Sequence, residues 1–460
     1  MNRQFQYFLI LIFISVIVGC NMEQPQIPID QVENYTEEQE SDQPPIINYG
    51  RFCEPKELIR NESAIQGYTD KQSYFPGAIV YFYIHSRSPE YKFNLYHIGS
   101  TEDLIESQTR SDGRIQNYLC YAYSWGSEWN TTFNYTLPTN LKSGYYSAEV
   151  KNETGSWWIS FVVKEPVKSA DIALIASTNT WCAYNDWGGG SYYANSIQEE
   201  TRYSENISFL RPDARSNPQE KKHLGGSELH LVRWLENKTI NYNLFTDLDL
   251  HTSPSTIRNY KVIILQTHPE YYTREMYNTI ERYVYNGGKL MYLGGNGMYA
   301  KVVYNPNLKI LETRKTGEFH SYENTVGGLW RNLEKPESAI LGVAYDKRGF
   351  DTFHPYKVKN NNHWIFKNTG LQKDDIFGEG CGRNGASGAE TDKIDDSSPK
   401  NLVHLAKGTN PDEGGADMIY YENSTGGRVF SVGSITYTSC INTDPAISQI
   451  TENVLVEFLK

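Results

Sequence analysis

The sequence predicts a doubly wound α/β domain at residues 169–460, preceded by an all-β sandwich at residues 51–168. The first observation is a pair of short apolar runs, residues 261–265 and 289–293, which read as buried strands. Between them, residues 272–285 place apolar side chains at helical spacing. Strand, helix and strand over roughly 35 residues form a βαβ unit, whose two strands run parallel. The second observation is that residues 51–168 carry several short β-rich runs separated by turn signals.

The first 50 residues predict export and a lipid anchor. The apolar run at residues 8–18 is too short to span a bilayer and is typical of a signal peptide, which we place at residues 1–20. It ends in Gly19-Cys20, which resembles a bacterial lipobox, so we expect a lipid on Cys20; an incidental cysteine after an ordinary signal peptide is the alternative. Residues 21–50 are polar and predict a disordered tether. We therefore expect a protein of the bacterial cell envelope, at the outer membrane or cell surface, that meets the membrane through its N-terminal lipid only.

The charge of the chain bears on its partners, and its cysteine content bears on its disulfides. The chain has 43 Lys and Arg against 55 Asp and Glu and no long basic run, so nucleic acid is not an expected partner. Exported chains favour disulfides. Cys53 and Cys120 fall in one predicted domain and are the expected pair, while the pairing of the others stays open. The cysteines other than Cys20 are Cys53, Cys120, Cys182, Cys381 and Cys440, an odd number that leaves at least one unpaired.

The elements of the two predicted domains follow from local patterns. In the sandwich, the β-rich runs lie at residues 78–84, 93–99, 143–150 and 157–163. In the α/β domain, the further strands lie at residues 171–177, 242–246 and 428–434, and the further helices at residues 228–236 and 447–459. We expect residues 179–193 to form a Gly-rich aromatic loop after the first strand. We interpret residues 305–402, with a strand-like piece at 339–343, as insertions over the ligand-binding edge of the sheet.

Polar side chains follow two neighbouring strands of the predicted βαβ unit. His268 and Glu270 come after the first strand, and Asn296 comes after the second. The carboxyl ends of parallel strands meet at one sheet edge, where open α/β sheets bind ligands. The sequence therefore predicts a polar site there. A tight turn that needs positive φ would also explain the glycines around Asn296.

Two other motifs allow alternative chemistry. Cys182 could be a nucleophile with His268 as its base, but it lacks the glycine-bounded elbow that such a cysteine occupies. Asp247, Asp249 and His251 alternate after a strand, so they either bind a cation or form a solvated loop ahead of a helix cap.

Taken together and in this order, several segments resemble the large subunit of N,N-dimethylformamidase and its relatives. They are Thr180-Trp181-Cys182-Ala183-Tyr184-Asn185, Gly189-Gly190-Ser191-Tyr192-Tyr193, Phe209-Leu210-Arg211-Pro212, Asp247-Leu248-Asp249-Leu250-His251, His268-Pro269-Glu270-Tyr271, Gly294-Gly295-Asn296-Gly297-Met298-Tyr299, Gly327-Gly328-Leu329-Trp330-Arg331 and Gly388-Ala389-Glu390-Thr391-Asp392. The resemblance covers roughly residues 170–460. It implies an α/β domain of glutamine-amidotransferase-like or flavodoxin-like type, and an amidohydrolase that cleaves the C–N bond of a small linear amide.

The resemblance also implies a mononuclear Fe(III) held by two tyrosinates and one glutamate. Glu270 matches the carboxylate ligand and Tyr184 one of the phenolates. Tyr193 matches the other phenolate, with the adjacent Tyr192 as the alternative. Phenolate and carboxylate are hard anionic donors that suit ferric iron. An unperturbed tyrosine has a pKa of ~10, so it would ionise at neutral pH only beside a cation.

The same resemblance assigns roles to three further residues. His268 and Asn296 match residues that line the substrate position, and Glu390 is a candidate active-site carboxylate. A Lewis-acidic iron could polarise the amide carbonyl and supply hydroxide. His268 could then relay protons and Asn296 could donate to the developing oxyanion.

Partners and a competing function stay open. The resembled enzyme has a separate small subunit, so either a small partner subunit or a homo-oligomer is expected. The competing hypothesis is a non-catalytic surface lipoprotein that binds glycans or other polymers on the same fold. The 35 tyrosines and 9 tryptophans and the predicted sandwich motivate it.

Overall fold

The computed structural model describes residues 58–193 and 202–460. The predicted signal peptide and tether, with Cys20 and Cys53, lie outside these residues. Within them, no helix has both the length and the apolar character needed to cross a membrane.

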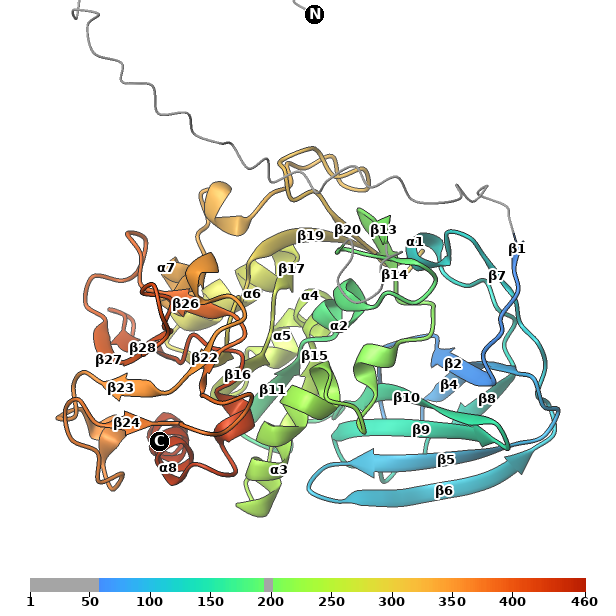
Figure 1. Cartoon of the computed structure of the whole chain (residues 1–460), viewed down its shortest axis with the longest axis horizontal. Helices are drawn as coiled ribbons and strands as arrows, with labels where there is room; N and C mark the ends of the chain where they lie inside the picture. The colour runs from blue at the N-terminus through green and yellow to red at the C-terminus, as the bar shows by residue number, and fades with distance from the viewer. Residues whose placement is uncertain (1–57, 194–201) are drawn as a thin grey trace, which may run out of the picture. The chain divides into compact units, whose positions relative to one another are not determined.

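The N-terminal part of the described chain folds into two sheets that share one apolar core (Figure 1). A five-stranded sheet has the order β3-β10-β9-β5-β6 and faces a three-stranded sheet of order β2-β4-β8. Phe82, Phe93 and Phe161 are fully buried between them because alternate side chains of each strand point inward. The strands are β2 (Ile65–Thr69), β3 (Ser73–Tyr74), β4 (Ile79–Ser86), β5 (Tyr91–Ile98), β6 (Glu102–Arg110), β8 (Phe133–Thr136), β9 (Gly144–Asn152) and β10 (Gly155–Val163). A short ribbon of β1 (Leu58–Ile59) and β7 (Tyr118–Leu119) and the helix α1 (Ala122–Trp125) complete this part.

A nine-stranded mixed sheet lies at the centre of the rest of the chain. Its order is β15-β11-β16-β18-β29-β28-β27-β23-β24. The first five strands are parallel, and every later pairing is antiparallel. The strands are β11 (Ile172–Ala176), β15 (Asn243–Thr246), β16 (Val262–Thr267), β18 (Lys289–Gly294), β23 (Tyr356–Val358), β24 (Ile376–Phe377), β27 (Val403–Gly408), β28 (Asp417–Glu422) and β29 (Arg428–Ser431).

The predicted βαβ unit is present. The helix α6 (Arg274–Tyr285) joins β16 to β18, which pair in parallel from Val262 with Lys289 to Thr267 with Gly294. Thr273 caps the helix by accepting a hydrogen bond from the Met276 N–H. Met276 is fully buried, as the helical spacing of its apolar residues requires.

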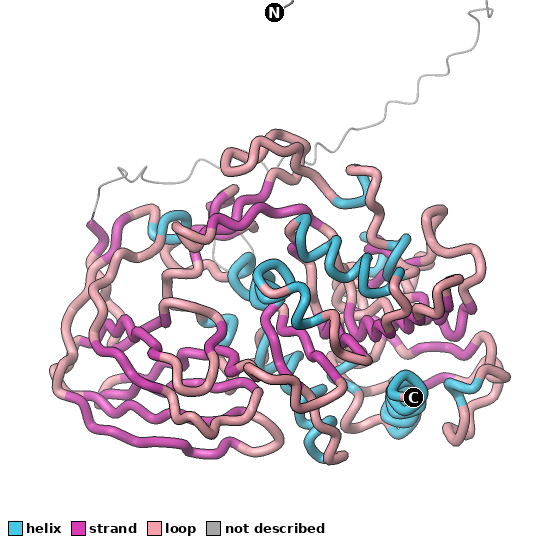
Figure 2. Tube along the Cα trace, turned by 180° about the vertical axis from the view of Figure 1, so that it is seen from behind, coloured by secondary structure: helices cyan, strands magenta, loops and turns pink. Residues whose placement is uncertain are grey.

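Helices cover both faces of the parallel strands (Figures 1 and 2). On one face lie α3 (Leu229–Asn237) and α8 (Pro445–Leu459), which share a core with Leu174 and Ile264. On the other lie α4 (Asp247–Thr252), α5 (Pro254–Ile257) and α6, which share a core with Ile263, Leu265 and Leu290. Sandwich residues such as Tyr145 and Val162 belong to the first of these cores, so the sandwich packs directly against this part of the chain.

The prediction of a doubly wound α/β domain is nevertheless wrong. Four of the nine strands join one side of the sheet through antiparallel pairings, and much of the remaining chain forms further small sheets, so the structure is mostly β. Residues 305–402 are not insertions alone, because they contribute β23 and β24 to the main sheet. The strand-like piece at 339–343 is instead the short helix α7 (Ser338–Leu341), which Gly342 ends in a left-handed conformation.

Smaller sheets surround the carboxyl ends of the parallel strands. A four-stranded one has the order β14-β20-β19-β17. Its strands are β14 (Asn206–Ser208), β17 (Tyr271–Tyr272), β19 (Ala300–Asn305) and β20 (Ile310–Thr313), and the two-stranded sheets are β12 (Gly190–Ser191) with β13 (Arg202–Tyr203), β21 (Ala344–Asp346) with β26 (Thr391–Lys393), and β22 (Phe353–His354) with β25 (Ser387–Gly388).

The described cysteines divide into bonded and free. Cys381 and Cys440 form a disulfide, and Cys120 is also disulfide-bonded. Cys53, the predicted partner of Cys120, lies outside the described residues. Cys182 is free and buried.

Candidate functional site

The candidate site lies where β11, β16 and β18 end. The segment after β11 is a helix, α2 (Thr178–Tyr184), and not the loop expected from its glycines and aromatic residues. The helix begins at Thr178, directly after Ser177, and Tyr184 is its last residue. Tyr193 follows β12, and His268 and Glu270 follow β16.

Tyr193 and Glu270 are in direct contact. Tyr193 Oη donates to Oε1 of Glu270 at 2.7 Å and lies 2.5 Å from Oη of Tyr271. Nζ of Lys315 donates to Oη of Tyr271 at 2.8 Å and is 4.0 Å from Oε1 of Glu270. Burial, and next the charge of Glu270, raise the pKa of Tyr193 well above its usual value. Without a metal ion beside it, this tyrosine is a neutral phenol.

Tyr184 packs against the same group. Its ring centroid is 4.2 Å from that of Tyr193 and 5.5 Å from that of His268. Burial, followed by the charges of Glu270 and Glu390, raises the pKa of Tyr184 well above its usual value. The two predicted phenol ligands thus lie side by side next to the predicted carboxylate ligand.

His268 lies between two carboxylates. Its Nε2 is 3.4 Å from Oε2 of Glu270 and 3.3 Å from Oε2 of Glu390. Burial lowers the pKa of His268, but the charges of Glu390 and Glu270 outweigh burial and leave that pKa raised. His268 is therefore suited to hold a proton between the two acids.

Asn296 and Glu390 form the other side of the site. Nδ2 of Asn296 donates to Oε2 of Glu390 at 2.6 Å. A side chain at Gly295 would place its Cβ 2.6 Å from the carbonyl oxygen of Glu390, so glycine permits this close approach. Burial raises the pKa of Glu390, but His268 and the Asn296 amide outweigh burial and lower it. Glu390 is thus held as a carboxylate.

Strained backbone surrounds these side chains. Thr267, Asn296, Met298 and Ala389 all have positive φ, at 62°, 52°, 52° and 63°. Such conformations are uncommon for residues other than glycine, and for a β-branched residue such as Thr267 they are genuine outliers. Clustered strain of this kind is typical of functional sites, where the surrounding structure imposes it.

The residues present fit a hard metal ion. Within the described ranges, no group of three or more His, Cys, Asp or Glu is arranged to hold a metal. A set with two tyrosines falls outside that pattern. Oε2 of Glu270 has no hydrogen-bond partner among the described residues, although the residue is only 1% exposed. A buried carboxylate oxygen that accepts no hydrogen bond and lies 3.4 Å from Nε2 of His268, next to two phenols, matches the donor chemistry of ferric iron.

The structure separates the alternatives left open by the sequence. Tyr193, not Tyr192, contacts Glu270, and Oη of Tyr192 has no hydrogen-bond partner among the described residues. Burial raises the pKa of Cys182 to about 12, which makes it a poor nucleophile. Asp247 and Asp249 are buried at the start of α4, where Asp249 completes a capping box with Thr246, so they form neither a solvated loop nor a cation site.

Three site residues were not identified from the sequence. Tyr271 belongs to the His-Pro-Glu-Tyr motif but has no distinctive spacing. Lys315 follows β20 in a polar stretch without any motif, and its ammonium lies 4.5 Å from the Tyr193 ring centroid. His223 has its ring centroid 5.0 Å from Tyr184 and 6.1 Å from His268. Only the fold brings these side chains to the site.

The fold and the site together define a class of chain in which a β-sandwich precedes a mixed sheet with a tyrosine- and carboxylate-rich site at its parallel edge. The family model "N,N-dimethylformamidase beta subunit-like, C-terminal" matches residues 96–450. The chain belongs to this family.

Curated relatives agree with this assignment. The N,N-dimethylformamidase beta subunit of Alcaligenes sp is 28% identical over 444 residues, covering 76% of this chain and 58% of the relative. That of Paracoccus aminophilus is 27% identical over 446 residues, with the same coverage of both chains. The chain therefore spans little more than half the length of these relatives. A solved structure, the mmIFT52 N-terminal domain, covers 49% of this chain and 87% of its own at 12% identity, with a TM-score of 0.30 that is too low to support any argument.

Proposed function

We propose that this protein hydrolyses the C–N bond of a small linear amide with a mononuclear Fe(III) held by Tyr184, Tyr193 and Glu270. The observation that carries the proposal is the contact between Tyr193 and Glu270, with the ring of Tyr184 beside them. The second oxygen of Glu270 is buried and accepts no hydrogen bond among the described residues, and Nε2 of His268 lies 3.4 Å from it. Two phenols and a carboxylate, brought together from three segments, supply three hard oxygen donors.

Two residues of the chain would supply proton transfer and stabilisation of the oxyanion. When bound, the iron supplies Lewis acidity toward the amide carbonyl and a hydroxide nucleophile. Nε2 of His268, held between Glu270 and Glu390, is placed to carry a proton to the departing amine. Nδ2 of Asn296 uses one of its two protons on Glu390, which leaves the other for the oxygen that gains charge in the transition state.

The relatives support this proposal and extend it to partners. Both are named as beta subunits of an amide-cleaving enzyme. We therefore propose that this chain also works with a further subunit or as a homo-oligomer. The lipid on Cys20 and a location in the cell envelope remain predictions, since Cys20 lies outside the described residues.

The test combines metal content with activity. The full-length protein, purified in detergent and reconstituted with iron, should hold about one iron per chain, show a visible tyrosinate-to-iron absorption band and release amine from dimethylformamide or a related amide. Glu270→Gln should lose the band and the activity. Glu312→Gln, a change at another fully buried glutamate that is paired with Arg314 outside the site, is the matched control and should retain both. Absence of bound iron after reconstitution would refute the proposal. Retention on polysaccharide that survives Glu270→Gln, without hydrolysis, would favour the polymer-binding alternative.

A further inference from the structure

Asp392 is a buried acid that the proposed chemistry does not use. It lies in β26 and is fully buried. Its Oδ1 accepts the backbone N–H of Asn296 at 2.7 Å, and its Oδ2 accepts the hydroxyl of Tyr292 at 2.7 Å. Both partners belong to the β18 end and the turn that follows it, so one carboxylate joins β26 to that turn.

Tyr292 completes the connection. Its Oη accepts the backbone N–H of Gly297 at 2.6 Å. Asp392 and Tyr292 therefore bind two consecutive amides of the turn, those of Asn296 and Gly297. Asn296 has φ of 52°, a left-handed conformation that is uncommon outside glycine but that asparagine adopts more readily than most residues. These two hydrogen bonds hold the turn together with those of the Gly295 amide to Thr267 and of the Met298 amide to Pro269.

The residue just before β26 contacts the side chain of Asn296. Glu390 directly precedes β26 and lies two residues before Asp392. Glu390 accepts from Nδ2 of Asn296, whereas Asp392 accepts from the backbone N–H. Thr391 points elsewhere and donates to the carbonyl of Gly414. Two acids that are two residues apart, Glu390 just before β26 and Asp392 within it, thus bind the amide group and the backbone of Asn296.

Asp392 is not what stability alone would favour at this position. Burial is the main reason that the pKa of Asp392 is raised to about 7, while the Tyr292 and Asn296 hydrogen bonds act in the opposite direction. A buried carboxylate is unfavourable unless fully hydrogen-bonded, and a neutral residue would avoid that desolvation. The hydrogen bonds from Tyr292 and Asn296 offset part of that cost, and both come from β18 and the turn that carries Asn296.

We propose that Asp392 is a positioning residue, which together with Tyr292 holds Asn296 in its left-handed conformation so that the Asn296 amide faces the site. This inference rests on the proposed function for its kinetic consequence, but its structural consequence is independent of that function.

The experiment compares Asp392→Asn with Asp417→Asn in the full-length protein. Asp417 is also a buried acid that accepts a backbone amide, that of Ile394, but it has no contact with Asn296. For Asp392→Asn we expect hydrogen exchange of the peptide covering residues 294–298 to rise at least about tenfold. We expect kcat for amide hydrolysis to fall about 10- to 100-fold with KM nearly unchanged, since the lost interaction forms only in the transition state. Asp417→Asn should leave both unchanged.

Each result decides the inference. Normal exchange at residues 294–298 and normal kcat in Asp392→Asn would overturn it. If that variant fails to fold, Tyr292→Phe removes the Gly297 contact and should produce the same exchange increase; normal exchange there would equally overturn it. If the wild-type protein hydrolyses no amide, the proposed function fails, and the exchange measurement alone still decides the role of Asp392.

Discussion

Oη of Tyr193 lies 2.7 Å from Oε1 of Glu270, although 77 residues separate the two in the chain. Tyr193 follows the short strand β12, and Glu270 follows β16 of the main sheet. The contact exists because both segments reach the carboxyl edge of the parallel strands, where Tyr184 and His268 also arrive. This contact distinguishes Tyr193 from its neighbour Tyr192 and gives the first test of the site.

Tyr193→Phe should lower iron affinity at least about tenfold and remove much of the visible absorption, because the phenol oxygen beside Glu270 is lost. The measurement is an absorbance titration with ferric iron. Tyr192→Phe is the matched control, since the Tyr192 hydroxyl is buried without a hydrogen-bond partner among the described residues. Equal loss in both variants would contradict the assignment of Tyr193.

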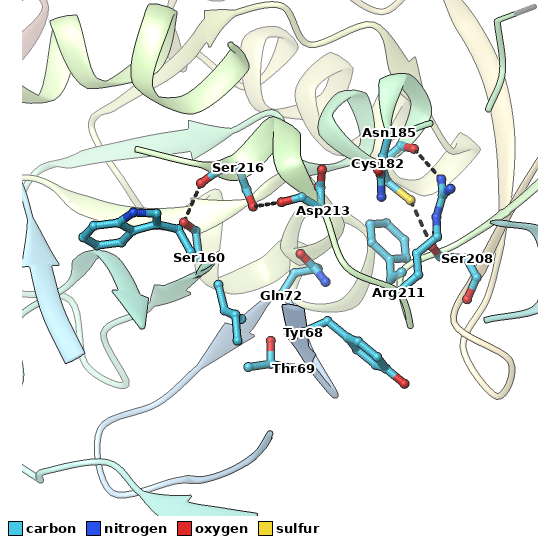
Figure 3. Close-up of a pocket in the computed structure, with 14 residues that line it drawn as sticks. Tyr68, Thr69, Gln72, Ser160, Cys182, Asn185, Ser208, Arg211, Asp213 and Ser216 are labelled. Atoms are coloured by element: carbon cyan, nitrogen blue, oxygen red, sulfur yellow. Dashed lines mark hydrogen bonds between the residues drawn. The ribbon is translucent and has the colours of Figure 1, made fainter. Parts of the chain in front are cut away.

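Arg211→Met should destabilise the protein by at least about 3 kcal/mol, because several buried carbonyls lose their donor at once. The guanidinium of Arg211 donates to the carbonyls of Cys182, Trp187, Gly190 and Ser208 and so fixes the chain between Tyr184 and Tyr193. Figure 3 shows Arg211 beside Cys182 and Ser208. Urea unfolding measures the effect. Arg348→Met is the control: its ion pair with Asp346 lies at the surface, and its loss should leave the urea midpoint nearly unchanged.

Glu228 should make stability depend on pH. It is buried and accepts from Trp181 Nε1 at 2.7 Å, while Tyr145 of the sandwich donates to its other oxygen. Burial raises the pKa of Glu228 to about 8. A raised folded-state pKa means that the folded protein binds the proton more tightly than the unfolded chain does. The contribution of protonated Glu228 to the free energy of unfolding is fully present below the unfolded-state pKa of about 4.3. It is lost as the pH rises through the folded-state pKa of about 8.

Glu228→Gln removes this titration. Between pH 5 and pH 8.5, the wild-type free energy of unfolding should therefore decrease by about 1–4 kcal/mol more than that of the variant. Chemical denaturation at several pH values measures the difference. Parallel pH profiles for the two proteins would show that Glu228 does not hold its proton in the folded state.

Cys182 should be unreactive in the folded protein and should not be needed for activity. Its thiol is 3% exposed, and its pKa is raised to about 12 by burial, so little thiolate forms at neutral pH. Cys182→Ala should retain amide hydrolysis within about twofold. A thiol reagent should label Cys182 in the native protein only after unfolding. Loss of activity in Cys182→Ala with iron content unchanged would revive the nucleophile hypothesis.

Local patterns were sufficient for the elements that bury one face in a regular way. The apolar spacing of Met276, Ile280 and Val284 predicted α6, and the β-rich runs predicted the long sandwich strands. The same patterns failed at α2, where glycines and aromatic residues suggested a loop, and at α7, whose four residues show no helical period. In both places tertiary contacts outweigh weak local preference.

The parallel arrangement of the main sheet was predictable only in part. A helix between two apolar runs forces the connected strands to be parallel, which fixes β16 and β18. Nothing in the short polar segments around β23 and β24 shows that they add antiparallel strands to the same sheet. Strand pairing across long separations has no local periodic signal, and this is why the doubly wound fold was the wrong expectation.

By itself, the sequence determined the βαβ unit and placed His268, Glu270 and Asn296 at one sheet edge, because strand direction follows from local connectivity. The motif resemblance added Tyr184, Tyr193 and Glu390 as candidates. Only the tertiary structure decided that Tyr193 and not Tyr192 meets Glu270, that Lys315 and His223 join the group, and that Asp392 holds Asn296. Side-chain contacts between distant segments depend on how those segments pack, and packing is a property of the whole fold.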